Sequence, residues 1–331
     1  MANSIVSLGL NSVVIYPNVI MGAPTVGVVV VSWNSKDETI SCLQSVLGSV
    51  EVNIEIAVVD NNSTDGTVDL IRSQFPDVEV IENNSNVGFG HACNQGMNYH
   101  LERGVDFLFL LNSDLYVGES TIRDLVNSTT QVEDFGMITP VVHYKNDKDS
   151  PIWFKRGHIN WATSTSFHES HSVPLVHSIS QNSLSREDQF LENDYIPLCS
   201  ALIDPNAVKE IGEIPEEYFL YYEDVDYCTQ FIENGWKVLT DTEIQVYHDE
   251  SASSGGRTSP TATYYNTRNH ILFLRRFSCK LNIFIAIAWS IVWFTTLLAY
   301  RLSKQNLEAG KALLEGILDG VLNRTGKGRY P

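Results

Sequence analysis

A carboxylate that follows an apolar run near the middle of the chain is the first candidate for chemistry. Residues 107–111 are all apolar, and Asn112-Ser113-Asp114 comes directly after them. A buried carboxylate without a partner is costly, so Asp114 fits the end of a buried strand, where the chain enters a ligand crevice. Carboxylate oxygens suit Mg²⁺ or Mn²⁺, which in proteins also take phosphate oxygens of a substrate. Asp114 is therefore a candidate metal ligand.

A histidine ends a second apolar run and is a candidate for the same site. His248 closes the stretch "VLTDTEIQVYH". An isolated histidine at a strand end is more often structural than a ligand. Beside an oxygen-liganded metal it becomes a plausible further ligand, because neutral imidazole also binds divalent metals.

A cluster of acids further along the chain could supply a general base. Glu223, Asp224 and Asp226 fall within one turn of "FLYYEDVDYC", among aromatic residues. Partial burial among aromatic rings raises a carboxyl pKa into the range useful for proton abstraction. The alternative is structural, since three acids also stabilise the positive end of a helix.

A polar turn, "DNNSTDGT", carries two more acids, Asp60 and Asp65. Asn, Asp and Ser favour left-handed positions and helix N-caps, so the stretch could be a turn and a cap alone. A second acidic strand end at Asp114 shifts the balance towards ligand binding.

Alternating elements are expected to position these residues. The apolar stretches "TVGVVVVS", "IEIAVVD", "VEVIEN" and "DFLFLLN" predict strands, and amphipathic segments between them predict helices. Such alternation predicts an α/β fold with a mostly parallel central sheet flanked by helices. Ligands bind beyond the carboxyl ends of such strands, so the polar turns should line one edge.

Composition and motifs exclude several function classes. The chain has 331 residues and 43% hydrophobic content, enough for a sizeable core. Its net charge of −18 disfavours nucleic acid as a partner. No G-x-x-x-x-G-K-[ST] loop is present, and "GFGHAC" lacks the third glycine of a dinucleotide fingerprint. The five scattered cysteines are expected to be reduced and mostly buried.

The C-terminal part has the composition of a membrane-associated segment. Residues 257–331 carry 11 bases against 3 acids, whereas the preceding body is strongly acidic. Residues 281–300 contain no charge, a length that could span a bilayer core. Basic residues on both flanks argue against a single span and favour an in-plane or re-entrant segment. The alternative is a soluble helical hairpin that covers a core or a dimer interface.

Six ordered motifs resemble the inverting glycosyltransferases of family 2, with the GT-A fold: "VVSWNS", "VVDNNSTDGT", "NVGFGHACNQG", "LLNSDLYV", "FLYYEDVDYC" and "YYNTRNHILFLRR". The chain looks most like the rhamnosyltransferase-like branch, which acts on lipid-linked saccharides. On this basis we expect an N-terminal leader at 1–23, a GT-A catalytic domain at 24–278, and membrane-associated helices at 279–331.

The resemblance implies a role for each matching residue. Asp224 would be the catalytic base, Glu223 would position the acceptor hydroxyl, and Asp114 and His248 would meet Mg²⁺ or Mn²⁺. Asn112 stands where the family often has a first aspartate, and Asp226 is expected to be structural. The nucleotide-sugar would contact Asn34, Asp60, Asn61, Asp65, Asn86, Gly88, Phe89, Gly90, Asn94, Asn112, Ser113 and Arg268. For Arg268 an ion pair with an acid of the catalytic body is an equal alternative.

The implied function is transfer of one sugar, with inversion, from a UDP- or dTDP-sugar to a polyprenyl-linked saccharide, at the cytoplasmic face of the cell membrane. One alternative is a nucleotide-sugar-binding scaffold that has lost catalysis, which Asn112 favours. Another is a processive polysaccharide synthase, although the chain lacks the Q-x-x-R-W motif and the several long apolar spans of such synthases.

Overall fold

The computed structural model describes residues 22–145, 151–169, 189–249, 258–280 and 282–330. The expected leader at 1–23 lies almost entirely outside the described residues.

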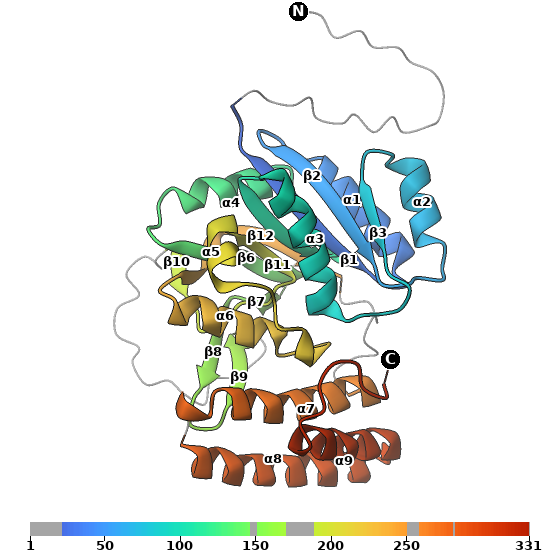
Figure 1. Cartoon of the computed structure of the whole chain (residues 1–331), viewed down its shortest axis with the longest axis vertical. Coiled ribbons are helices and arrows are strands. Elements are labelled where there is room, and N and C mark those ends of the chain that lie inside the picture. Colours follow the sequence, from blue (N-terminus) through green and yellow to red (C-terminus); the bar gives the residue numbers. More distant parts are fainter. Residues whose placement is uncertain (1–21, 146–150, 170–188, 250–257, 281, 331) are drawn as a thin grey trace, which may run out of the picture.

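The N-terminal half alternates strands and helices as the sequence predicts (Figure 1). Its strands lie in the order β3-β2-β1-β4, and all of these pairs are parallel. The register aligns Ser32 with Asp60 and Val31 with Asn112, so the polar strand ends meet at one edge. The elements are β1 (Thr25–Ser32), α1 (Lys36–Leu47), β2 (Asn53–Asp60), α2 (Thr67–Gln74), β3 (Glu79–Glu82), α3 (Phe89–Arg103) and β4 (Phe107–Asn112).

Helix α3 packs very closely on the sheet. An added Cβ at Gly96 would come within 2.3 Å of the Val29 side chain. The buried His100 ring lies over Gly27, and its Nε2 is 3.1 Å from the carbonyl oxygen of Val28. This contact fixes the helix that begins at the edge where the strands end.

The second half extends the sheet to ten strands, in the order β10-β12-β6-β11-β4-β1-β2-β3, with β5 pairing β12 and β7 pairing β6. Strand β11 is antiparallel to both β4 and β6, whereas β6 and β12 are parallel to each other. The elements are β5 (Leu115–Tyr116), α4 (Thr121–Thr129), β6 (Phe135–Tyr144), β7 (Ile152–Phe154), β10 (Phe190–Glu192), β11 (Ser200–Ile203), α5 (Pro205–Ile211), η1 (Glu216–Tyr218), α6 (Glu223–Glu233) and β12 (Lys237–His248). The hairpin β8 (Arg156–Asn160) and β9 (Thr165–Glu169) stands apart.

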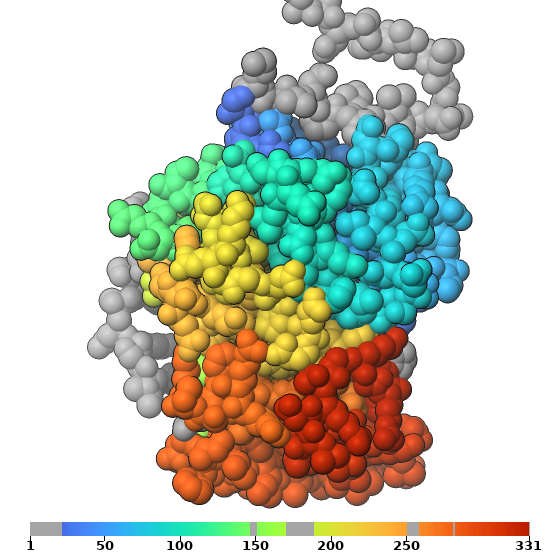
Figure 2. Space-filling view, in the orientation of Figure 1, coloured from blue at the N-terminus to red at the C-terminus, as the bar shows by residue number. Residues whose placement is uncertain are grey.

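The C-terminal helices form a layer against one end of this body (Figures 1 and 2). Helices α7 (Pro260–Arg276) and α9 (Leu307–Val321) pack together, and the hydroxyl of Tyr264 donates to Asp319 at 2.7 Å. Helix α8 (Ile283–Ser303) lies on the outside of the layer and leaves most of its apolar side chains exposed. A short turn, η2 (Ser278–Lys280), precedes it.

The chain beyond α8 returns to the catalytic body. The amide of Gly326 donates to the carbonyl of Glu217 at 2.7 Å, and the hydroxyl of Tyr265 donates to the carbonyl of Tyr330 at 3.0 Å. The segments on both sides of α8 thus contact the same part of the structure. An orientation along the membrane surface is compatible with these contacts.

The fold expectations are confirmed in outline. The chain is α/β, helices flank the central sheet, and a long apolar helix lies near the C-terminus. Four cysteines are buried, Cys279 is exposed, and all five are free thiols.

Candidate active site

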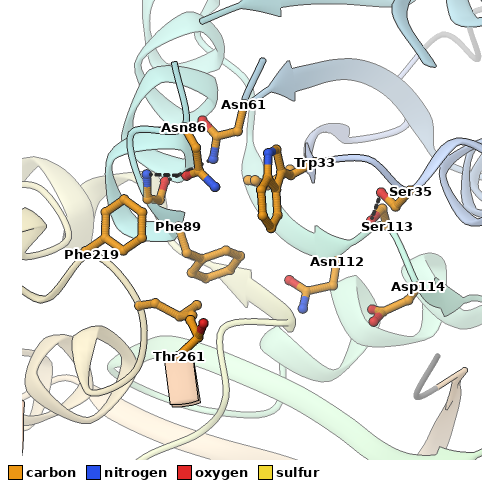
Figure 3. A pocket seen from close by; sticks show the side chains of 13 residues that line it. Trp33, Ser35, Asn61, Asn86, Phe89, Asn112, Ser113, Asp114, Phe219 and Thr261 are labelled. Atoms are coloured by element: carbon orange, nitrogen blue, oxygen red, sulfur yellow. Dashed lines mark hydrogen bonds between the residues drawn. The ribbon is translucent and has the colours of Figure 1, made fainter. Parts of the chain in front are cut away.

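A cavity of about 170 Å³ opens at the carboxyl ends of β1, β2 and β4 (Figure 3). Many of the residues predicted to bind a ligand line it. Its wall consists of Val31, Trp33, Ser35, Asn61, Asn86, Gly88, Phe89, Asn112, Ser113, Asp114, Phe219, Leu220 and Thr261. The strand ends therefore converge on one site, as the parallel topology predicts.

The two candidate metal ligands lie side by side. Nε2 of His248 is 3.2 Å from Oδ2 of Asp114, and the two strand ends are joined because the Asp249 amide donates to the Asp114 carbonyl at 2.9 Å. Trp153 packs edge-on against the His248 ring, with a centroid distance of 4.9 Å. Strand pairing at Leu115 and His248 explains why these distant residues meet.

Unsatisfied oxygens at this point fit a cation. Oδ1 of Asp114 and Oδ1 of Asn112 are both buried and have no hydrogen-bond partner in the described structure. Such orphaned acceptors are rare unless an ion, a water or a ligand satisfies them. Among the described residues no group of three or more His, Cys, Asp or Glu gathers at one point. A site with one carboxylate and one imidazole leaves room for phosphate oxygens, as Mg²⁺ sites commonly do.

Asp60 ends β2 and Asn61 follows it; Asn61 lines the cavity and Asp60 does not. Asp60 is 2% exposed, and its Oδ2 accepts from the Ser63 amide at 2.8 Å while Oδ1 has no partner among the described residues. The amide group of Asn61 donates to the Gly88 carbonyl at 3.3 Å and accepts from Asn83 at 3.0 Å. Asn61 thus ties the end of β2 to the turn before α3.

The turn at residues 86–90 depends on a glycine. Gly88 has φ +95, and an added Cβ would lie 2.6 Å from the carbonyl oxygen of Phe219. The same carbonyl accepts from the Phe89 amide at 2.9 Å, and the Gly88 amide donates to Oδ1 of Asn86 at 3.0 Å. These contacts close the cavity between the 86–90 turn and the segment that leads to α6.

Three predicted contact residues instead hold the scaffold behind the cavity. Oδ1 of Asn34 accepts from the Thr64 amide at 2.8 Å. The Asp65 carboxylate accepts from the Lys36 amide at 3.0 Å and from Thr67, and these hydrogen bonds lower its pKa despite partial desolvation. The side chain of Asn94 donates a hydrogen bond to the Ile214 carbonyl at 3.0 Å and accepts one from the Ile214 amide at 2.9 Å. None of the three lines the cavity, and neither does Gly90, which packs against Ile214.

Helix α6 begins in strained backbone. Phe219, Tyr221 and Tyr222 have φ values of +63, +67 and +75, which non-glycine residues rarely adopt. The side-chain amide of Asn269 supports the segment by donating to the carbonyls of Tyr218, Leu220 and Tyr221 at 2.9, 2.7 and 2.8 Å. Strain held this firmly is typical of functional sites.

The two candidate catalytic carboxylates are the first two residues of this helix. Glu223 is 6% exposed and its Oε2 has no partner in the described part of the chain, while Oδ1 of Asp224 accepts from the Val225 amide at 2.8 Å. Burial raises the pKa of both carboxyl groups, and the charge of Asp224 raises that of Glu223 further. An Asp224 pKa closer to neutrality suits a general base.

The helix start and the end of β4 lie around one buried thiol. Burial, followed by the negative charges of Asp114 and Asp224, raises the pKa of Cys199. The carbonyl of Cys199 accepts from the Asn112 amide at 2.8 Å. The metal-binding candidate and the base candidate therefore flank the same short segment.

Asp226 has the structural role expected for it. Its carboxylate accepts from the hydroxyl of Tyr218 at 2.6 Å and from Gln230 at 2.8 Å, and Nε of Arg276 lies 3.0 Å away. Fully buried and fully bonded, it anchors α6 to α7.

Arg268 binds the C-terminal segment to the turn before α6. Its guanidinium donates to the carbonyls of Gly326 at 2.6 Å and Tyr218 at 2.7 Å, and it lies over the Tyr265 ring. Its partners among the described residues are carbonyls, the neighbouring Asn269 and Tyr264, and no ion pair with an acid is found there. We assign it a structural role and do not retain it among the donor contacts.

Sequence reasoning missed several residues of the wall. Trp33 belongs to the polar turn after β1 that the sequence places at this edge, whereas Ser35, two residues on, was not predicted. Phe219 and Leu220 belong to the strained segment, and Thr261 comes from the start of α7. Nζ of Lys327, near the C-terminus, lies 3.4 Å from the Asn86 carbonyl, a contact across 241 residues that no local pattern predicts.

Comparison with curated proteins finds relatives along nearly the whole chain. The dTDP-rhamnosyl transferase RfbF of Shigella flexneri is 26% identical over 317 residues, which is 91% of this chain and 97% of that protein. The low-salt glycan biosynthesis hexosyltransferase Agl10 of Haloferax volcanii is 23% identical and covers 91% of this chain and 92% of its own length. An N-acetylglucosaminyl-diphospho-decaprenol L-rhamnosyltransferase of Mycobacterium tuberculosis is 22% identical over 69% of this chain and 77% of its own.

Solved structures share the fold. The mannosyltransferase PcManGT of Pyrobaculum calidifontis, solved with GDP-Man and Mn²⁺, superposes with a TM-score of 0.54 at 13% identity, covering 92% of this chain and 89% of that one. GalNAc-T7, solved with UDP, GalNAc and Mn²⁺, gives a TM-score of 0.55 at 16% identity over 77% of this chain and 48% of its own. The profile of Glycosyl transferase family 2 matches residues 27–192. The chain belongs to this family and is a glycosyltransferase with the GT-A fold.

Proposed function

We propose that this glycosyltransferase moves one sugar, with inversion, from a UDP- or dTDP-sugar to a polyprenyl-linked saccharide. The observation that carries the proposal is the arrangement around Cys199: Asp114, which lines the cavity and pairs with His248, and Asp224, at the start of α6, both act through their charge on this one buried thiol. This supplies a place for a diphosphate leaving group beside a base.

The donor would occupy the cavity at the strand ends. Asp60 and Asn61 would meet the nucleoside, since Oδ1 of Asp60 is buried and has no hydrogen-bond partner among the described residues. Trp33 and Phe89 offer aromatic surface for the base (Figure 3). Asn112 and Ser113 continue the wall towards Asp114 and so would lie along the ribose and diphosphate.

Asp114 and His248 would hold a divalent cation, Mg²⁺ or Mn²⁺, together with the donor diphosphate. When bound, the cation would stabilise the charge that develops on the departing diphosphate. The orphaned oxygens of Asp114 and Asn112 support this assignment. Two structures with the same fold, GalNAc-T7 and PcManGT, were solved with Mn²⁺, which is compatible with this assignment.

Asp224 would act as the general base. An acceptor hydroxyl is a weak nucleophile until a positioned carboxylate removes its proton in the transition state, which contributes roughly 10²–10⁴-fold. Burial raises the pKa of Asp224 and so strengthens it as a base. One base that acts opposite the leaving group implies single displacement with inversion. Glu223, buried beside it, would orient the hydroxyl.

The acceptor would reach the enzyme from a membrane surface, on its cytoplasmic face. Helix α8 is 21 residues long, has a mean hydropathy of 2.0, and exposes large apolar side chains such as Phe284, Ile291 and Trp293. A contiguous apolar face of this kind marks an interaction surface. One curated relative is named for a decaprenol-linked substrate, which supports a lipid-linked acceptor here.

The test is a thermal-shift panel with UDP, dTDP, GDP and CDP, each with Mn²⁺, Mg²⁺ or neither, followed by a transfer assay onto a polyprenyl diphosphate saccharide. We expect UDP or dTDP to raise the melting temperature only when a metal is present, by mass action. In Asp114→Asn, adding metal should no longer allow the nucleotide to raise the melting temperature. A wild-type protein that binds none of the four nucleotides, or that never glycosylates the lipid-linked acceptor, would refute the proposal.

A further inference from the structure

A second cavity, of about 410 Å³, lies between the catalytic body and the apolar helix α8. Helices α7 and α8 form most of its wall, and strand β9 and the residue before α6 complete it. The lining residues are Thr165, Ser166, Tyr222, Ala262, Thr263, Asn266, Thr267, His270, Trp289, Trp293, Phe294, Leu297 and Arg301.

The cavity contains a buried arginine that has no acidic partner in the described part of the chain. Arg301 is 6% exposed, Nη2 donates to Oγ1 of Thr263 at 3.2 Å, and Nε has no partner among the described residues. In that part of the chain no carboxylate lies within ion-pair distance of Arg301, whereas Arg276 on α7 meets both Glu217 and Asp226. A buried guanidinium without an anion is costly, so the site is incomplete without one.

The rest of the lining also favours an anion attached to an apolar chain. None of the lining residues is acidic, and Thr263, Asn266 and Thr267 supply polar groups. Burial lowers the pKa of His270 to about 4, so its ring is neutral at physiological pH. Trp289 and Trp293 are about half exposed at the outer end, on the apolar helix. Tryptophan at such a position is typical of a membrane interface.

One residue of the cavity wall directly precedes the candidate catalytic carboxylates in the chain. Tyr222 lines the cavity and is the N-cap of α6, so the next two residues are Glu223 and Asp224. Tyr195 lies close to Ser166 of the wall, and its pKa is raised by burial and then by the charge of Asp224. A ligand in the cavity would therefore have its polar end near the base.

We infer that this cavity binds the phosphate group of the polyprenyl-linked acceptor. Arg301 donates to the phosphate oxygens, because a guanidinium matches phosphate geometry. Trp289 and Trp293 pack against the first isoprene units, and the saccharide extends past Tyr222 towards Asp224. The inference rests on the proposed function and adds a recognition site for the lipid phosphate, distinct from the donor diphosphate site at Asp114.

The experiment compares wild type, Arg301→Gln, Arg301→Lys and the control Lys304→Gln, which removes an exposed charge one turn further along the chain. Steady-state kinetics use a polyprenyl diphosphate saccharide and, separately, an alkyl glycoside of the same sugar that lacks phosphate. We expect Arg301→Gln to raise KM for the diphosphate acceptor at least tenfold, with partial rescue by Arg301→Lys. KM for the alkyl glycoside, and the Kd of the donor nucleotide, should stay within twofold, and Lys304→Gln should match wild type.

Two further measurements keep the inference open to refutation if Arg301→Gln folds poorly. Tryptophan fluorescence of the wild-type protein is titrated with farnesyl diphosphate, farnesol and inorganic diphosphate, and we expect farnesyl diphosphate to bind at least tenfold more tightly than farnesol. Sedimentation with phosphatidylglycerol vesicles separates a headgroup site from an acceptor site.

Equal affinity for farnesyl diphosphate and farnesol would overturn the inference, as would an unchanged acceptor KM in a folded Arg301→Gln. A loss of vesicle binding in Arg301→Gln that accounts for the rise in KM would also overturn it, in favour of a headgroup site. If wild type and Arg301→Gln glycosylate the lipid-linked acceptor equally well, the role of the cavity in acceptor binding is refuted and the proposed function stands. A wild type with no transfer refutes the proposed function instead.

Discussion

Replacing Gly88 by alanine should damage both stability and donor binding, because two independent costs meet at this position. Its φ of +95 with ψ of 170 lies in a region that is essentially restricted to glycine, and a residue with a Cβ costs about 1–3 kcal/mol there. The new Cβ would also lie 2.6 Å from the Phe219 carbonyl oxygen. Moving that carbonyl weakens its bond with the Phe89 amide, which contributes about 1 kcal/mol. We expect a total loss of about 2–4 kcal/mol.

Gly104→Ala is the matched control. Gly104 ends the same helix, α3, that Gly88 begins, and its φ is +73, but no atom lies within 4 Å of an added Cβ. The control should lose only the backbone cost, about 1–2 kcal/mol. Urea denaturation measures both losses, and titration with the preferred nucleotide and metal measures the donor Kd. Gly88→Ala should weaken the donor about tenfold, equivalent to about 1.4 kcal/mol, and Gly104→Ala should not.

Equal unfolding free energies and equal donor affinities in the two variants would refute the view that contact between the 86–90 turn and Phe219 closes the donor cavity. If Gly88→Ala loses stability but keeps its donor affinity, the 86–90 turn does not contribute to donor binding.

Three further predictions concern the base, the tail and the membrane face. Burial raises the pKa of Asp224, and a base acts when deprotonated, so the rate should fall as pH falls through a midpoint above the ordinary aspartate value of about 3.9; a kcat profile with its acid limb near pH 4 would contradict this. Nζ of Lys327 lies beside Asn86 at the cavity wall, so Lys327→Gln should raise the donor KM about 3–10-fold with little change in kcat, whereas Lys311→Gln on the exposed side of α9 should change neither. Ile291 is 58% exposed on α8, so Ile291→Asp should release the enzyme from vesicles without lowering its melting temperature; unchanged co-sedimentation would show that α8 is not the membrane face.

The sequence predicts the architecture well where the pattern is local. Apolar runs and amphipathic segments identify β1 to β4 with the helices between them, and the acids after β2 and β4 converge as parallel strands require. Asp114 and His248 were both predicted at strand ends. Their separation of 3.2 Å follows from the pairing of β5 with β12, which joins segments more than 100 residues apart.

Residue type alone could not separate ligand contacts from scaffold contacts. Asp65 and Asn94 have the polar side chains of a binding site, but backbone amides and carbonyls of neighbouring segments satisfy them. Arg268 lies in a motif that resembles a site motif, yet carbonyls brought together by α7 and the C-terminal segment surround its guanidinium. Arg301 lies on an apolar helix, and its burial depends on how α8 packs against α7.

The central claim is that Asp224 is the base of a transferase whose donor site lies at Asp114. Its most direct test is a single-turnover transfer assay with Asp224→Asn, at saturating donor and acceptor, together with the donor Kd of the same variant. The account predicts a fall in rate of at least about 100-fold, because the asparagine cannot accept the proton, with donor affinity within twofold of wild type. Transfer at the wild-type rate by Asp224→Asn would contradict the account.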